Sequence, residues 1–260
     1  MKLYIFPLLL TLFSGMSTLL GGFITFFVKR DNLKALSIGL GFSAGVMVYV
    51  SLNELIAESA TMLGSFYGVQ LSKILAFVGF ALGIVIAILI DYFIPDHIED
   101  DFLSTSKKTQ RQKVRRAGLI TALAVALHNF PEGIATFLVS SQDLMLGIPV
   151  AIAIAIHNIP EGIAIALPIF HSTGKKRLAI LYSFLSGISE PIGGLIGVLL
   201  LKTVMPDQAV GIMTAAVAGI MVYISFDTLL PLAREYGENH HVIIGIVSGM
   251  LIMSLGLIFL

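Results

Sequence analysis

Two stretches of sequence decide the fold: AGLITALAVALHNFPEGIATFLVS, residues 117–140, and LMLGIPVAIAIAIHNIPEGIAIALPI, residues 144–169. A helix that crosses a bilayer needs about 20 mainly apolar residues, and each stretch meets that length. Their apolar runs are continuous rather than alternating, which favours helices over a β-barrel, because unpaired backbone is very costly in lipid. The two stretches therefore predict neighbouring membrane-spanning helices, each with the polar motif H-N-x-P-E-G inside it.

The composition of the whole chain is that of a membrane protein. Of 260 residues, 57% are hydrophobic and 12% are charged, and the formal net charge is zero. Most of the chain must therefore face lipid, and no basic footprint indicates a nucleic-acid partner. There is no cysteine, which excludes disulfides, thiolate metal sites and cysteine nucleophiles. Any metal ion must be held by His, Asn, Asp, Glu, Met or backbone oxygen.

Eight such apolar stretches follow one another along the chain. We expect an all-α membrane protein with one transmembrane domain over residues 1–260, embedded in the lipid bilayer. The first stretch is too long for a signal peptide, and the only long polar connection is a loop at residues 95–116. The expected spans are residues 4–28, 35–58, 73–94, 117–140, 144–169, 178–201, 208–232 and 242–260.

Lys and Arg are distributed unevenly between the two ends of this bundle. Twelve of the 16 lie in the connections after spans one, three and five. The positive-inside rule therefore places the loop at residues 95–116 in the cytoplasm. With eight spans, both termini are then extracytoplasmic.

Two internal sequence repeats relate segments that are expected to run in opposite directions. Residues 128–138 and 157–167 agree at eight of eleven positions, and they lie in spans four and five. Residues 44–55 and 218–229 agree at seven of twelve, and they lie in spans two and seven. Inverted-topology repeats are typical of transporters, whose substrate site lies near the midplane where the repeats meet. Chance likeness between apolar helices is the alternative for the second pair.

The H-N-x-P-E-G motifs carry the polar side chains of spans four and five. Residues three and four apart share a helix face, so each motif projects an imidazole, an amide and a carboxylate together. Nitrogen and oxygen donors of this kind suit Zn²⁺, Fe²⁺, Mn²⁺ or similar ions, and two shared carboxylates are able to bridge two ions. Carboxylates at membrane depth are functional by default, although hydrogen bonding between helices is the simpler alternative. The donor residues are His128, Asn129, Glu132, His157, Asn158 and Glu161.

Each motif also contains a proline and a glycine. Pro131 and Pro160 lack an N–H, so each frees the carbonyl four residues earlier and is expected to kink its helix. A passing cation is one possible partner for a freed carbonyl in lipid. Gly133 and Gly162 follow the acids and permit neighbouring helices to approach closely.

Other acids lie within the apolar stretches. Glu190, in SGISEPIGG of span six, is expected to be a ligand from a third helix, or else a protonated acid. Glu54 and Glu58 share a face of span two, and Glu58, near the outer end, either receives ions or is simply solvated. Asp227 in span seven stands at the repeat position of Asn53, and its role stays open.

The cytoplasmic loop contains two different charged segments. It begins with PDHIEDD, residues 95–101, where His97 lies among four acids. This segment either captures metal that leaves on the inner side or forms a solvated surface. The later KKTQRQKVRR, residues 107–116, is typical of a topology anchor that contacts anionic lipid.

Glycines four residues apart give three helix faces that suit close packing. These faces are candidates for a homodimer contact. The pairs are Gly41/Gly45, Gly79/Gly83 and Gly193/Gly197.

The tandem motifs, followed by SGISEPIGG, resemble the ZIP (Zrt/Irt-like) metal transporters, and the short length resembles the bacterial ZupT type. The resemblance covers nearly the whole chain, and it implies a two-metal site on the fourth and fifth helices with help from the sixth. One ion would lie among Glu132, His157 and Glu161. The other would lie among Asn129, Glu132, Asn158, Glu161 and Glu190. His128 also stands at a motif position and ranks after these residues as a ligand.

The resemblance further implies a function. Such proteins move metal toward the cytoplasm, so we expect a multi-pass importer of zinc, iron and other divalent ions in the cell (inner) membrane. These ions are the cargo, and no separate cofactor is expected. The loop departs from the family's long His-rich tracts, since it has one histidine.

Two other functions are alternatives to import. An intramembrane metalloenzyme would use zinc-bound water, but H-E-x-x-H is absent and the duplicated donors leave no obvious open coordination position. We therefore expect no enzyme activity. A metal-selective channel with the same ligands is the second alternative, and saturation of the flux at low metal distinguishes a carrier from it.

Overall fold

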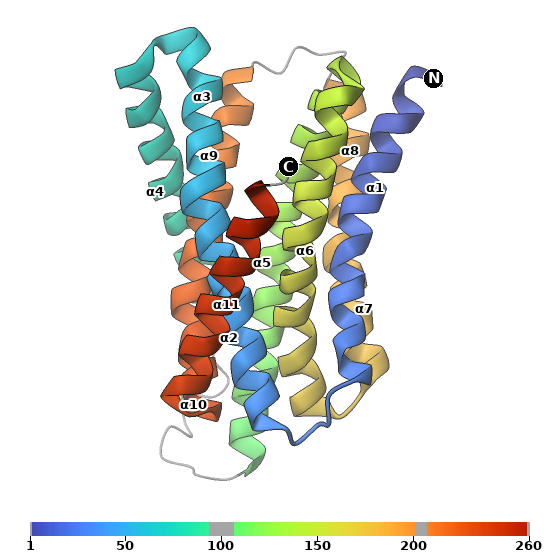
Figure 1. Ribbon diagram of the computed structural model, residues 1–260, viewed down its shortest axis with the longest axis vertical. Helices are drawn as coiled ribbons and strands as arrows, with labels where there is room; N and C mark the ends of the chain where they lie inside the picture. The colour runs from blue at the N-terminus through green and yellow to red at the C-terminus, as the bar shows by residue number, and fades with distance from the viewer. Residues whose placement is uncertain (1, 94–106, 201–206, 259–260) are drawn as a thin grey trace.

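The computed structural model describes residues 2–93, 107–200 and 207–258, and Figure 1 shows these residues as a bundle of long helices. All elements in the described ranges are helical. They are α1 (Lys2–Gly22), η1 (Phe23–Phe26), α2 (Leu33–Val50), η2 (Ser51–Leu55), α3 (Ile56–Tyr67), α4 (Val69–Phe93), α5 (Lys107–Gln142), α6 (Leu144–Thr173), α7 (Lys176–Gly187), α8 (Ser189–Leu200), α9 (Asp207–Ile224), η4 (Ser225–Leu229), α10 (Leu230–Tyr236) and α11 (Asn239–Ile258).

In the described part of the chain, eight helical segments are long and apolar enough to cross a membrane. This confirms the expected number, but some bounds differ. Span two continues to Tyr67, and α5 begins at Lys107, inside the expected loop. Lys, Gln and Arg favour helix, so residues 107–116 extend α5 although they are too polar for the membrane. The segment with His97 lies outside the described residues.

Span six is not one helix, contrary to expectation. It is divided into α7 and α8, which meet at Ile188. Pro191 has no N–H to donate to the carbonyl of Gly187, four residues earlier, so the helical ladder is interrupted there. Pro191 instead lies in the first turn of α8, where a missing N–H is tolerated.

Two short π-helical segments interrupt the repeated spans two and seven. They are η2 and η4, and they occupy the last five positions of the aligned repeats 44–55 and 218–229. In each, the first serine bonds back to a methionine carbonyl, from Ser51 to Met47 at 2.7 Å and from Ser225 to Met221 at 2.8 Å. Both methionines are fully buried in the main core, so they are packing residues.

The helices form two groups (Figure 1). In one, α1 and α5 pack on α6, and α7 and α8 complete the group; in the other, α11 packs on α2 and α4 packs on α3 and α9. Contacts of α2 with α6 and of α5 with α9 join the groups. The most buried spans are those through α2 and α6, whereas α4 and α11 lie at the periphery.

The three glycine pairs are used inside the chain. Gly41 and Gly45 touch α11, Gly79 and Gly83 touch α9, and Gly193 and Gly197 touch α5. Added Cβ atoms at most of these positions would meet the backbone of the neighbouring helix. These faces are therefore not available as a dimer contact, which corrects that expectation.

The ends of α6 are defined by local sequence. Asp143 is its N-cap, and the side chain of Asp143 accepts a hydrogen bond of 2.8 Å from the backbone N–H of Met145. At the other end, Gly174 adopts a left-handed conformation with φ 72°, which glycine takes without strain. Arg30 donates to the last carbonyls of α6, those of His171 (3.1 Å) and Ser172 (2.9 Å).

Candidate metal centre

The two H-N-x-P-E-G motifs face each other across α5 and α6. These helices are packed together and run in opposite directions (Figure 1). All predicted ligands are buried, including Glu190 from α8, and none is more than 6% exposed. The structure therefore brings together the residues His128, Asn129, Glu132, His157, Asn158, Glu161 and Glu190.

Imidazoles and carboxylates pair reciprocally between the two helices. His128 of α5 lies 2.9 Å from Glu161 of α6, measured from Nε2 to Oε1. In return, Nε2 of His157 of α6 lies 3.5 Å from Oε2 of Glu132 of α5. The first residue of each motif thus pairs with the fifth residue of the other, a reciprocity that antiparallel packing permits. The buried carboxylates of Glu132 and Glu161 are thus each paired with an imidazole, which offsets part of the free-energy cost of their burial.

The two asparagines bind neighbouring backbone. Nδ2 of Asn158 donates to the carbonyl of Ser14 at 3.0 Å, and Nδ2 of Asn129 donates to the carbonyl of Ser186 at 3.3 Å. Because each amide nitrogen is held, each Oδ1 is turned the other way. The asparagines therefore present oxygen, the atom that binds a cation.

Glu190 is held by two side chains. The Ser14 hydroxyl contacts Oε1, and Nδ2 of Asn158 donates to Oε2 at 2.8 Å. A third helix, α8, is thereby connected to the motif on α6, as expected from the sequence. Ser14 also brings α1 into the site, which the sequence analysis did not predict.

Each of the six motif donors has one buried atom without a hydrogen-bond partner. Such atoms are costly in a protein interior unless an ion or water satisfies them. They are Nδ1 of His128 and His157, Oδ1 of Asn129 and Asn158, Oε1 of Glu132 and Oε2 of Glu161. In the described ranges, no three His, Asp or Glu side chains are grouped closely enough to hold an ion as they stand. Side chains that now pair with each other would have to turn toward the ion.

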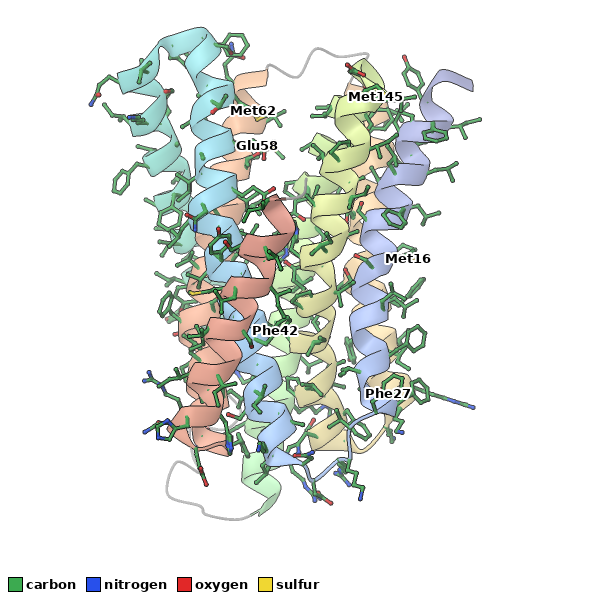
Figure 2. The ribbon with its side chains drawn as sticks, in the orientation of Figure 1. Met16, Phe27, Phe42, Glu58, Met62 and Met145 are labelled. Carbon is green, nitrogen blue, oxygen red and sulfur yellow. The ribbon has the colours of Figure 1, made fainter. Side chains whose placement is uncertain are left out.

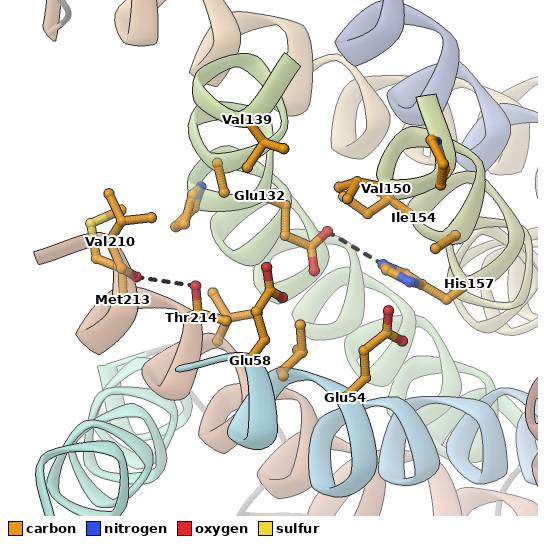
Figure 3. A pocket seen from close by; sticks show the side chains of 16 residues that line it. Glu54, Glu58, Glu132, Val139, Val150, Ile154, His157, Val210, Met213 and Thr214 are labelled. Atoms are coloured by element: carbon orange, nitrogen blue, oxygen red, sulfur yellow. Dashed lines mark hydrogen bonds and ion pairs between the residues drawn. The ribbon is translucent and has the colours of Figure 1, made fainter. Parts of the chain in front are cut away.

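A cavity of about 300 Å³ leads to this centre. Glu132 and His157 line it from α5 and α6, and Glu54 and Glu58 line it from η2 and α3 (Figure 3). Figure 2 shows Glu58 in the half of the bundle where the N-terminus lies. Glu58 is half-buried and faces the cavity. Asp227 does not line this cavity.

α5 and α6 each continue as one helix through Pro131 and Pro160, although neither proline can donate the hydrogen bond to the carbonyl four residues earlier. The expected kinks stay predictions. Ser43 of α2 donates to the Pro160 carbonyl at 2.6 Å. The close approach beside the site is confirmed: a Cβ at Gly133 would overlap the Glu190 carbonyl, and a Cβ at Gly162 would overlap that of Thr18.

A third repeat was missed in the sequence. Residues 14–17 read SGMS and residues 186–189 read SGIS. Their first serines supply the carbonyls that bind the two asparagines, and Gly15 and Gly187 touch each other. Four letters of small residues in apolar helices are a weak signal. The repeat is supported because the first serine of each copy binds the asparagine at the same position of an H-N-x-P-E-G motif.

Replacing Ser14 with alanine is expected to lower the apparent affinity for transported zinc about tenfold, in the range seen when a residue supporting a metal ligand is removed. Glu190 would lose the hydroxyl that holds Oε1. Zinc uptake into vesicles as a function of concentration measures the effect, and Ser14→Thr is expected to restore part of the affinity. Ser248→Ala is the matched control, since the Ser248 hydroxyl bonds within α11, to the carbonyl of Gly245. Equal affinities for Ser14→Ala and Ser248→Ala would argue against this role.

Comparison with known proteins shows the family to which the chain belongs. A family model described as ZIP zinc transporter matches residues 95–256. The zinc transporter ZupT of Clostridium perfringens is 45% identical over 268 residues, which covers 96% of this chain and 94% of that protein. The chain belongs to the ZIP zinc transporter family. The ZIP model spans both motifs and Glu190, so the buried donors lie within the part of the chain that defines the family.

Other relatives cover the chain to the same extent. The zinc transporters ZupT of Akkermansia muciniphila and Streptococcus mutans are each 46% identical, and each match covers 96% of both chains. The ZIP resemblance inferred from the motifs, including the ZupT type, is therefore confirmed.

Proposed function

We propose that this chain imports divalent transition-metal ions, zinc and also iron, across the cell membrane through a two-metal site at α5 and α6. Its family consists of transporters rather than enzymes, and zinc is the ion named in its relatives. The observation that carries the proposal is the set of buried, unpartnered donor atoms on two facing motifs. A cation would satisfy these atoms and offset the burial of two carboxylates.

We assign the ligands of the two ions as the family resemblance implies. One ion would bind Glu132, His157 and Glu161. The other would bind Asn129, Glu132, Asn158, Glu161 and Glu190. Both glutamates bridge the ions, and the Oδ1 atoms of the asparagines are oriented to take part. The two His–Glu pairs must open for this, so protons leave as metal binds.

We also infer that the chain consists of inverted repeats. The motif pairs, the two π-helical segments and the S-G-x-S pair all relate helices of opposite direction. Gly79 and Gly83 of α4 contact α9, and Gly245 and Gly249 of α11 contact α2 in the same way. Spans one to three thus correspond to spans six to eight, and α5 corresponds to α6.

The basic connections favour a cytoplasmic location for the end opposite the cavity. Both termini and the cavity would then be extracytoplasmic, with metal captured outside and released inside. The cavity lies where the two helix groups meet, so a rearrangement of one group against the other would change access to the centre.

Uptake of radiolabelled zinc and iron into vesicles that contain the purified protein tests this function, with pH gradients of either sign imposed. Saturable uptake of both ions at low concentration, far below diffusive rates, is the expected result. Flux that rises without saturation would indicate that the protein is a channel rather than a carrier. Absence of metal-dependent uptake under all gradients would refute the proposal.

A further inference from the structure

The cavity is much larger than a bare metal ion. Its volume is about 300 Å³. Water in the liquid occupies about 30 Å³ per molecule, so six first-shell waters around a divalent ion need roughly 180 Å³. The cavity therefore has enough volume for a divalent cation with its first shell of waters.

The charge of the cavity favours a cation. Three carboxylates line it, those of Glu54, Glu58 and Glu132, against one imidazole, that of His157. Among the described residues, no Lys or Arg lines it, and the other lining side chains are apolar except Thr214. Figure 3 shows the three acids and the imidazole pointing into the same space.

The polar atoms at the cavity are short of partners. Oε1 of Glu132 and Nδ1 of His157 have no hydrogen-bond partner, and these residues are only 6% and 2% exposed. Oε2 of Glu54 is also buried without a partner. Buried atoms of this kind indicate a ligand that supplies hydrogen bonds or charge.

The backbone places Glu54 and Glu58 on the cavity side. Glu54 lies in the π-helical segment η2, where the N–H of Ile56 bonds to the carbonyl of Ser51, five residues earlier. This wide turn changes the direction of the side chains around it, and such turns are frequent at functional sites. Glu58 follows in the first turn of α3.

The spacing of these groups fits water-mediated contact. As they stand, no three His, Asp or Glu side chains in the described ranges are close enough to bind one bare ion. Carboxylates farther apart are able to accept hydrogen bonds from the waters of a hydrated ion. We propose that Glu54 and Glu58, with Glu132, form a waiting site that holds a hydrated divalent cation through its water shell before the ion loses water and enters the two-metal centre. This inference rests on the proposed function.

Hexaamminecobalt(III) is the probe for this site, because it has the size of a hydrated ion and does not release its ammine ligands. It is expected to bind the wild type and to inhibit zinc uptake reversibly. In the double variant Glu54→Gln, Glu58→Gln, which keeps side-chain size, the inhibitory concentration is expected to rise at least about tenfold, because two charges near the probe are lost. Glu235→Gln and Glu238→Gln, made together on exposed acids, form the matched control and should behave as wild type.

Direct binding of the probe separates this inference from the proposed function. Glu161 does not line the cavity, so Glu161→Ala is expected to bind hexaamminecobalt(III) as wild type does while failing to transport zinc. Equal binding and inhibition in wild type and the Glu54/Glu58 double variant would overturn the waiting site. Absence of probe binding to the wild type would overturn it as well. Wild-type protein that binds the probe but moves no zinc would refute transport and leave the waiting site standing.

Discussion

Zinc uptake by a Glu161→Ala variant is expected to fall about 100-fold or more below wild type. Glu161 is fully buried, contacts His128, and is assigned to both ions as a bridge. Loss of a residue that only supports a metal ligand typically costs 10- to 100-fold, and loss of a bridging ligand should exceed that. Initial rates of radiolabelled zinc uptake, normalised to the amount of folded protein in the vesicles, measure the effect.

Glu238→Ala is the control for this variant, because Glu238 is exposed and lies between α10 and α11. It should transport as wild type. Thermal unfolding of Glu161→Ala in detergent shows whether the fold survives. A folded Glu161→Ala protein with at least half of the wild-type rate would remove Glu161 from the site.

Replacing Gly133 with alanine is expected to lower the free energy of unfolding by about 2 kcal/mol, within the range for overpacked interiors. The added Cβ would overlap the backbone carbonyl of Glu190, so α5 and α8 must move apart. Since α8 carries Glu190, zinc uptake should fall as well. Thermal unfolding in detergent and zinc uptake in vesicles measure the two consequences.

Gly256→Ala is the matched control, since its Cβ would meet the nearest heavy atom at 4.0 Å, an ordinary van der Waals contact. Both variants make the same chemical change within a membrane helix. If Gly133→Ala unfolds at the same temperature as Gly256→Ala, the tight crossing of α5 and α8 is not a source of stability.

The helix count and the residues that gather at the candidate site could be predicted because their signals are local. Eight apolar stretches have the length that the bilayer imposes, and one motif appears twice with ligands at helical spacing. Antiparallel direction then placed the motifs opposite each other. The reciprocal pairing of His128 with Glu161 could not be predicted, because it depends on how far α5 is shifted along α6.

Other features could not be predicted from the sequence, because hydropathy indicates which segments lie in the membrane and does not indicate backbone geometry. The helix α5 begins at Lys107, in polar sequence. Hydropathy detects only apolar helices, so it could not indicate this first part of α5. The π-helical segments η2 and η4 have no characteristic composition. Their only common feature in the sequence is that they occupy the same positions of a repeat. The role of Ser14 depends on a contact between α1 and α8 that no spacing along the chain reveals.

Anomalous diffraction at the zinc absorption edge, from crystals of the protein grown with zinc, tests the central claim most directly. The account predicts two zinc ions between α5 and α6, about 3.5–4 Å apart, with carboxylate and imidazole ligands at about 2.0–2.2 Å. Glu132 and Glu161 should each contact both ions. Zinc bound elsewhere in the bundle, with none between Glu132 and Glu161, would contradict it.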